Sequence, residues 1–240
     1  MKLQRKGTRH SHRGVIGVES AIVMIAFVIV AAALAFVVLN MGFTTSQKAK
    51  TTIISGLGES SSSMQVAGKV IGVGCSSSSS DTSCATTPEL NATAIPIRIT
   101  SGGDAVDLAV ATTTVKYLSN SVEYDDIYSG PITAEEHRSL TLAFREAGND
   151  AMTGFGSKMY NPVNGSLATQ TAAIIYWSVQ SNTNSILDQG EHAVLTVAYA
   201  TADRPAALDK VRVELIPATG SSLTVERQVP VITQSVIDLG

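Results

Sequence analysis

The sequence is poor in charged and aromatic side chains. Charged residues make up 15% and aromatic residues 5% of its 240 residues, although 44% are hydrophobic. An average soluble protein has about 25% charged residues. Serine, threonine, alanine and valine fill the difference, and this mixture favours β-strands with small polar side chains over a highly charged cytosolic surface.

Signatures of catalysis and of cofactor binding are also missing. The sequence has no HExxH metal motif, no phosphate-binding GxxxxGK(S/T), no GxSxG elbow and no dinucleotide fingerprint. Outside the first fourteen residues it has two histidines, His137 and His192, in unrelated contexts. We therefore expect no enzyme, no catalytic residue, no metal site and no cofactor.

Cysteine is nearly absent, and its two copies lie close together. Cys75 and Cys84 flank a run of serines at residues 76–80. A metal half-site would need a second pair of ligands, and none lies nearby in the sequence. Two cysteines that close a short polar loop outside the cell favour a disulfide, which would stabilise the fold by at most roughly 3 kcal/mol. We predict a Cys75–Cys84 disulfide.

The net charge of −3 conceals an uneven distribution. The first fourteen residues hold five basic side chains and no acidic one, whereas the remainder holds 12 of the 17 basic residues and all 20 acidic ones. The basic tip lies where an apolar segment begins, which is typical of a membrane segment and not of nucleic-acid binding. We expect no nucleic-acid partner.

The apolar segment at residues 21–39 contains no polar side chain, no proline and no glycine. As a helix, its nineteen residues would extend about 28 Å, close to the thickness of a bilayer's hydrocarbon core. Three interpretations fit such a segment: a secretory signal peptide, a permanent membrane anchor, or a class III leader that is cut before the apolar run. A signal peptide needs a small-residue cleavage site after a short apolar region, and the NMGF sequence at residues 40–43 is a poor one.

The junction before the apolar run favours the class III leader. Arg13 and Gly14 place a basic residue and a glycine between the charged tip and the apolar run. Glycine has no side chain, so a membrane peptidase can hold its backbone closely. We predict that residues 1–14 are a leader, that cleavage follows Gly14, and that Val15 becomes the first mature residue.

Cleavage there would make Glu19 the fifth mature residue. Glu19 is the only charged residue between Arg13 and Lys48. A carboxylate in the first turn of a helix offsets the helix dipole by about 0.3–1 kcal/mol. If it is buried in a dry bundle instead, it needs a cation, and the new α-amino group of Val15 is a candidate. Both roles for Glu19 are open at this stage.

Several sequence segments resemble a known family. RGVIGVE at residues 13–19 and AIVMIAFV at residues 21–28 resemble the start of archaellins, the archaeal flagellins, and of their type IV pilin relatives. Similarity to archaellins in particular lies in NMGFTTSQKAK at residues 40–50, SGLGE at 55–59 and GKVIG at 68–72, and more loosely in VRVELIP at 211–217 and VPVI at 229–232.

The resemblance implies a structural subunit of the archaellum, the archaeal motility filament. Its expected partners are further copies of itself, a prepilin-type leader peptidase, the membrane motor or assembly platform, and the cytoplasmic membrane before assembly. The mature protein would be extracellular, in a filament with helices bundled inside and β-domains outside. Alternative functions are an adhesion pilin, a membrane-anchored cell-surface module, or an exported enzyme held by its amino terminus. Type IV pilins often have a glutamate at mature position five, whereas many archaellins lack it.

Beyond residue 74 the pattern becomes that of β-strands. Ile95, Ile97 and Ile99 alternate with more polar residues, as in a half-buried strand. Further strands are expected at residues 107–118, 122–128, 139–145, 173–180, 193–200, 211–216 and 223–229, and a long loop at 147–172. We therefore predict an α+β fold, in which a long apolar helix at residues 15–73 precedes an antiparallel, immunoglobulin-like β-sandwich at residues 74–240.

Two sequons lie in the expected outer domain. They begin at Asn91 and at Asn164, and sequons outside the cell are plausible sugar acceptors on exposed loops. We predict N-glycans at Asn91, at Asn164 or at both.

Overall fold

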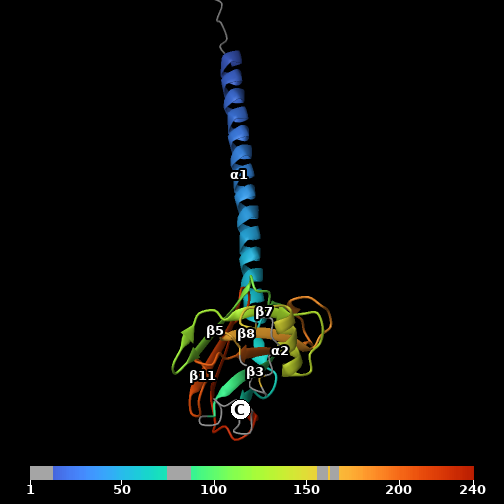
Figure 1. The fold of residues 1–240 in the computed structure, drawn as a ribbon. Helices are drawn as coiled ribbons and strands as arrows, with labels where there is room; N and C mark the ends of the chain where they lie inside the picture. The colour runs from blue at the N-terminus through green and yellow to red at the C-terminus, as the bar shows by residue number, and fades with distance from the viewer. Residues whose placement is uncertain (1–12, 75–87, 156–161, 163–167) are drawn as a thin grey trace, which may run out of the picture. The chain divides into compact units, whose positions relative to one another are not determined.

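The computed structural model describes residues 13–74, 88–155, 162 and 168–240. It divides into two compact units, Met1–Ser55 and Gly56–Gly240. A long apolar helix precedes a β-rich domain with antiparallel sheets, as expected from the sequence (Figure 1).

The first element is helix α1, Arg13–Ser61, of 49 residues. Its apolar part is rich in valine and isoleucine, which have modest helix propensity but no alternative way to satisfy their backbone in an apolar environment. Its later part is rich in threonine. Three of these hydroxyls donate to carbonyls of the preceding turn: Thr44 to Met41, Thr51 to Gln47 and Thr52 to Lys48, at 2.9–3.0 Å.

The helix ends earlier than the sequence pattern predicts. The pattern predicts one helix over residues 15–73, but α1 ends at Ser61, and strands β1, Met64–Val66, and β2, Ile71–Gly74, follow. β1 pairs with residues 97–99, so these residues belong to the β-rich domain. The turn at Gly220, with φ of +106°, packs on Ser62: a Cβ there would lie 2.5 Å from the Ser62 carbonyl oxygen. Ser221 N–H donates to that same oxygen at 2.9 Å.

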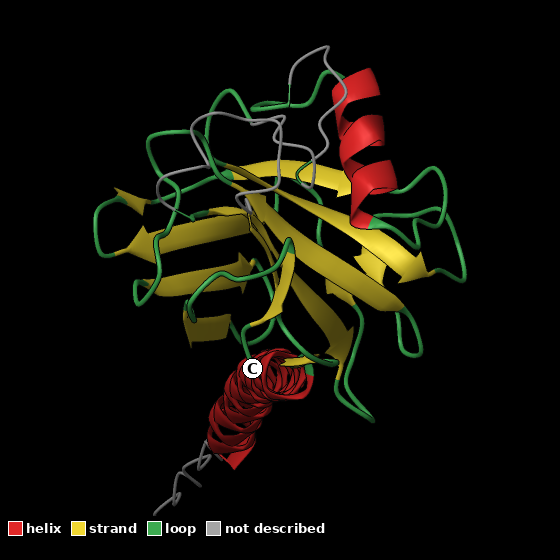
Figure 2. Ribbon diagram, turned by 60° about the horizontal axis from the view of Figure 1, so that its bottom comes forward, coloured by secondary structure: helices red, strands yellow, loops and turns green. Residues whose placement is uncertain are grey.

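The larger sheet has seven strands in the order β13-β2-β3-β10-β8-β7, with β1 also paired to β3. Figure 2 shows the strands of the β-rich domain in yellow. The strands not yet defined are β3 (Leu90–Ile99), β7 (Tyr128–Ile132), β8 (Ala172–Val179), β10 (His192–Ala198) and β13 (Val236–Asp238). All of its pairings are antiparallel except that of β7 with β8, which is parallel.

A second sheet has four strands in the order β12-β11-β5-β6. These strands are β5 (Thr113–Ser119), β6 (Glu123–Tyr124), β11 (Lys210–Pro217) and β12 (Leu223–Gln228). A short pair joins β4 (Val106–Asp107) to β9 (Ile186–Leu187), and helix α2 spans Leu140–Asn149.

The main core contains side chains from both sheets. Ile95 and Ile97 of the larger sheet belong to the same buried cluster as Val115, Tyr117 and Leu215 of the smaller one. Tyr117 and Tyr199 pack with ring centroids 5.3 Å apart. Alternation along β3 and β11 is thus explained by one shared apolar layer, as in a sandwich.

A second core covers the other face of the larger sheet. Ile174 and Tyr176 of β8 cluster with Phe144 of α2 and with Phe155, and the two phenylalanine rings lie 5.3 Å apart. β8 is therefore buried on both faces, which explains why its sequence AAIIYW is continuously apolar instead of alternating.

Three expected strands differ in the structure. The strand predicted at residues 107–118 is interrupted at residues 108–112, which separate β4 from β5. The strand predicted at residues 139–145 is wrong, because this segment forms most of α2, where Ala143, Phe144 and Ala147 make a buried helical face. The strand predicted at 122–128 is divided into β6 and β7. Between them, Asp126 accepts hydrogen bonds from the backbone N–H of Tyr128 at 3.0 Å and of Val115 at 3.3 Å, which turns the chain.

Candidate functional site: the apolar surface of helix α1

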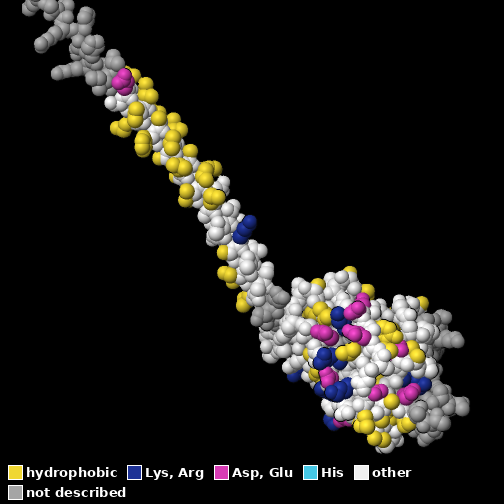
Figure 3. Space-filling view, turned by 90° about the vertical axis from the view of Figure 1, so that its left-hand side faces the viewer, with side chains coloured by type: hydrophobic (Ala, Val, Ile, Leu, Met, Phe, Trp, Pro, Cys, Tyr) yellow, Lys and Arg dark blue, Asp and Glu magenta, His cyan; other side chains and the backbone are white. Residues whose placement is uncertain are grey.

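The most unusual surface among the described residues is that of α1. Ile22, Phe27, Phe36 and Leu39 are 61–76% exposed, and no polar side chain interrupts residues 21–39. Figure 3 shows hydrophobic side chains covering this part of the helix. A helix that is apolar all round is normally buried in a core or in a membrane.

The extent of the surface fits either environment. The Gly17–Gly58 part of α1 is long and apolar enough to cross a membrane, with a mean hydropathy of 3.3 in its most apolar window, and none of that window is buried. Thirteen large hydrophobic side chains are exposed between residues 21 and 39. Burying each contributes about 1.5–3 kcal/mol, so covering them all represents gross stabilisation on the order of 20–40 kcal/mol.

The threonine-rich part of α1 is also suited to burial. The hydroxyls of Thr44, Thr51 and Thr52 have acceptors within the helix itself, so a dry neighbour would not leave them unpaired. Packing against α1 could therefore continue beyond the apolar run without a large desolvation cost.

The predicted cleavage site lies at the very start of α1. Its backbone is helical from Arg13, so Gly14 and Val15 fall in the first turn. Glu19 is exposed, and it follows Val15 by four residues, a spacing that places both on one helix face. The structure thus brings Val15 and Glu19 to neighbouring positions, while cleavage and charge pairing stay predictions.

Three other predicted residues, Cys75, Cys84 and Asn164, lie outside the described residues. The disulfide and the glycan at Asn164 therefore stay predictions.

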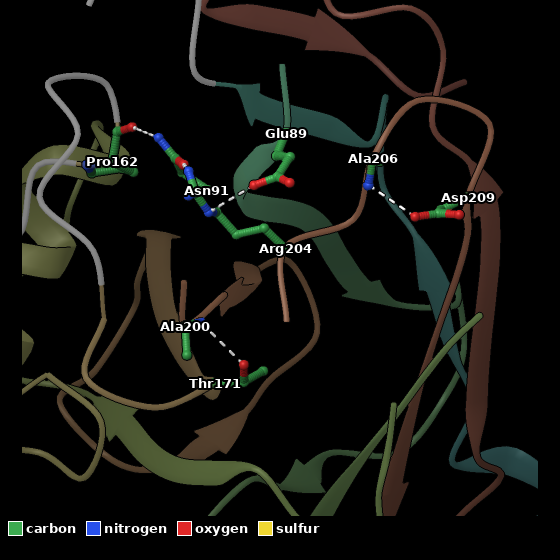
Figure 4. Close-up of polar contacts among 8 residues, drawn as sticks. All are labelled: Glu89, Asn91, Pro162, Thr171, Ala200, Arg204, Ala206 and Asp209. Atoms are coloured by element: carbon green, nitrogen blue, oxygen red, sulfur yellow. Dashed lines mark hydrogen bonds and ion pairs between the residues drawn. The ribbon is translucent and has the colours of Figure 1, made fainter. Parts of the chain in front are cut away.

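Asn91 does not lie on an exposed loop. It is 3% exposed in the central strand β3, and its Nδ2 atom donates a hydrogen bond to the carbonyl oxygen of Pro162 at 2.8 Å (Figure 4). On the other side of its amide, Arg204 Nη1 lies 3.4 Å from Asn91 Oδ1. Arg204 also forms an ion pair with Glu89, with 3.2 Å between Nε and Oε2. This enclosure argues against a sugar on Asn91 in the folded domain.

The two histidines of the β-rich domain lie in different surroundings. His137 is buried with its ring edge-on to Tyr176, at 6.3 Å between centroids, and His192 begins β10. Across the part of the chain that the structure describes, no group of three or more His, Cys, Asp or Glu side chains could hold a metal ion.

The sequence is similar to those of known proteins. Residues 14–227 match the family model for archaeal-type flagellin. "Probable flagellin 1" of Aeropyrum pernix is 34% identical over 218 residues, which cover 91% of this chain and 92% of that protein. "Probable flagellin 2" of Archaeoglobus fulgidus is 34% identical over 117 residues, which cover 48% of this chain and 56% of that protein.

Solved structures share the fold. The archaeal flagellum of Methanospirillum hungatei superposes with a TM-score of 0.53 at 23% identity, covering 89% of this chain and 93% of that one. Flagellin FlaB1 from Methanocaldococcus jannaschii gives a TM-score of 0.53 at 16% identity, covering 73% of this chain and 95% of that one.

Proposed function

The chain belongs to the archaeal-type flagellin family and is a structural subunit of the archaeal motility filament, and we propose that its copies polymerise by packing their α1 helices together. The observation that carries this proposal is the exposed apolar surface of α1. A monomer in water would not keep so large an apolar surface exposed, so another molecule must cover it. The family is one of filament subunits and not of enzymes.

Before assembly, the same surface would lie in the cytoplasmic membrane. The length and hydropathy of α1 support this stage. Lipid would cover the apolar side chains first, and neighbouring helices would cover them in the extracellular filament. Assembly thus exchanges one apolar environment for another, so its net free energy depends on close helix packing and on polar contacts between subunits.

Entry into the filament would begin with removal of residues 1–14 by a leader peptidase. Support comes from the Arg13–Gly14 junction and from the match to the family model, which begins at Gly14 and leaves the basic tip outside. The membrane platform that assembles and turns the filament would be the second partner. A permanently anchored surface module would instead keep α1 in lipid.

A pair of matched substitutions tests polymerisation through α1. Val30→Asp places a carboxylate in the apolar run, where Val30 is 58% exposed, and Val231→Asp makes the same change at a loop valine that is 65% exposed. We expect Val30→Asp to abolish filaments and Val231→Asp to leave them nearly normal, as measured by filament yield from cells. Thr113 would be a poor control, because it is 3% exposed and donates a hydrogen bond to the Asp107 carbonyl.

Normal, stable filaments from Val30→Asp cells would contradict the proposal, and the permanent-anchor interpretation would then replace it. The level of precursor in the membrane should be measured in both variants, so that lost assembly is separated from lost synthesis.

A further inference from the structure

Charged side chains are few along residues 17–58 of α1, and the acidic one lies far from the basic ones. Within residues 17–58, whose side chains the structure describes, they are Glu19, Lys48 and Lys50, and all three are exposed. Figure 3 shows an acidic side chain (magenta) near the start of the helix and basic side chains (dark blue) farther along it, with hydrophobic side chains (yellow) between. A carboxylate buried without a cation in a helix bundle opposes assembly strongly, so Glu19 needs a basic partner there.

The two lysines point to different sides of the helix. Each residue of an α-helix turns the chain by about 100°, so positions 48 and 50 face nearly opposite directions. Lys50 shares its side with Phe43, Ile53 and Ile54, at spacings of seven, three and four residues, and these side chains are 58–68% exposed. The polar Ser46 and Gln47 lie at the remaining spacings of four and three, so this side of the helix is mainly but not wholly apolar around Lys50.

Lys48 has polar neighbours instead. At spacings of three and four residues it shares its side with Thr44, Thr45 and Thr52, and the Thr52 hydroxyl donates to the Lys48 carbonyl at 2.9 Å. Of the two cations, Lys50 is the one that close helix packing would bury.

We propose that Lys50 of one copy pairs with Glu19 of another copy inside the filament, and that this ion pair fixes the stagger between their helices. The proposal rests on polymerisation through α1. Subunits of an open helical filament all point the same way along its axis. Glu19 and Lys50 are 31 residues apart, so pairing requires parallel helices offset by about 46 Å at 1.5 Å per residue.

The pair cannot form within one subunit, because the same distance separates the two side chains along a continuous helix. The α-amino group of a mature Val15 would compete for the Glu19 carboxylate, four residues away on the same helix face. A pair with Lys50 bridges two copies and sets their register, whereas a pair with Val15 can form inside each copy alone.

Zero-length cross-linking of native filaments distinguishes these partners. A carbodiimide activates a carboxylate, and attack by a neighbouring amine then forms an amide with release of the activator as a urea. We expect peptide mass mapping to find Glu19 joined to Lys50, and denaturing gels to show that the link connects two chains. Links from Glu19 to Val15 or to Lys48, without the link to Lys50, would overturn the proposal.

Charge exchange tests the same pair without a reagent. We expect Lys50→Glu to lower filament yield roughly tenfold or more, because it places two carboxylates together in the bundle. The matched change Lys48→Glu should keep the yield within about twofold, as for an exposed charge. Combining Glu19→Lys with Lys50→Glu restores opposite charges and should recover most of the lost yield. Yields are normalised to precursor in the membrane.

Equal losses from Lys48→Glu and Lys50→Glu, or an exchanged double variant no better than Lys50→Glu alone, would also overturn the proposal. Those results leave polymerisation through α1 intact, since filaments of the unaltered chain still form. The failure of that function has a different signature, namely normal filaments from Val30→Asp cells.

Discussion

The side-chain nitrogen of Asn91 donates a hydrogen bond to the backbone carbonyl of Pro162, 71 positions away, at 2.8 Å. Asn91 lies in the central strand β3, so this bond ties Pro162 to the larger sheet. The donor is the nitrogen to which an N-glycan would be attached, in a side chain that is only 3% exposed. The asparagine of this sequon therefore has a structural role.

We expect the peptide that contains Asn91 to be unmodified in intact filaments, and Asn164 to be the sugar acceptor of the two. Glycopeptide mass spectrometry measures both. Asn91→Ala should lower the free energy of unfolding by about 1–3 kcal/mol, because it leaves buried polar partners unpaired. Full occupancy by a glycan at Asn91 would show that the enclosed amide is not the native arrangement.

The mature chain should begin at Val15. Amino-terminal sequencing of purified filaments tests this, and Gly14→Phe should block processing because a bulky side chain keeps the peptidase from the backbone. Gly7→Phe is the matched control, since Gly7 also follows a basic residue but lies before the apolar run. A filament protein that begins at Met1, or beyond residue 39, would refute the predicted leader.

Cys75 and Cys84 should be linked in the extracellular filament. Mass mapping without reduction should find one joined peptide pair, and Cys75→Ser with Cys84→Ser should lower stability by at most roughly 3 kcal/mol, because the closed loop is short. Two free thiols in intact filaments would exclude the link.

Glu191 should be more important for stability than its position in the sequence suggests. It is 1% exposed, and its carboxyl group accepts hydrogen bonds from Trp177 Nε1 at 3.0 Å and from the backbone N–H groups of Ser181 at 2.7 Å and Asp188 at 3.1 Å. Glu191→Ala should destabilise the β-rich domain by about 3 kcal/mol, since the buried Trp177 Nε1–H and two partly buried backbone N–H groups lose their acceptor.

Thermal unfolding followed by circular dichroism measures this loss. Glu123→Ala, at an exposed position of β6, should change the free energy of unfolding by less than about 0.5 kcal/mol. Equal melting temperatures for the two variants would mean that the Glu191 contacts do not stabilise the domain.

Alkaline pH should unfold the β-rich domain. Burial raises the pKa of Tyr176 to about 12 and raises those of Tyr117, Tyr128 and Tyr199 above their ordinary value of 10.0. The folded state holds these protons more tightly, so this stabilisation is complete below pH 10 and is lost as the pH rises from there through the folded pKa values. Tyrosinate absorbance should therefore rise together with unfolding, and Tyr176→Phe should make stability less steeply dependent on pH.

The sequence predicted those elements whose pattern depends on neighbours along the chain. The apolar run of α1 and the alternation of Ile95, Ile97 and Ile99 are local signals, and both elements are present. α2 was missed although its signal was local too: Ala143, Phe144 and Ala147 have helical spacing. A short amphipathic segment satisfies either period over five or six residues, and its extension to Asn149 decides for a helix.

Burial from distant segments could not be predicted in this way. Asn91 reads as a loop acceptor until β2 and β10 are known to flank its strand. Thr113 stands in a run of three threonines, a polar pattern that does not predict burial, yet it is buried with its hydroxyl bonded to the Asp107 carbonyl. The carboxyl group of Glu191 has no local sign of its three donors, which come from β8 and from the loop before Glu191. Each depends on which segments the sheets bring together.

The uninterrupted apolar surface of α1 also affects how stable the filament is against loss of subunits. When two such helices pack together, each buries one face and its other faces stay exposed to water. Dimers and trimers in water would therefore gain only part of the available burial. No small soluble oligomer should therefore accumulate during filament assembly. Dissociation of a subunit from the filament is also unfavourable, because it exposes the whole apolar surface of α1 to water at once. A filament broken from its cell should therefore keep its length for long periods instead of shedding subunits from its ends.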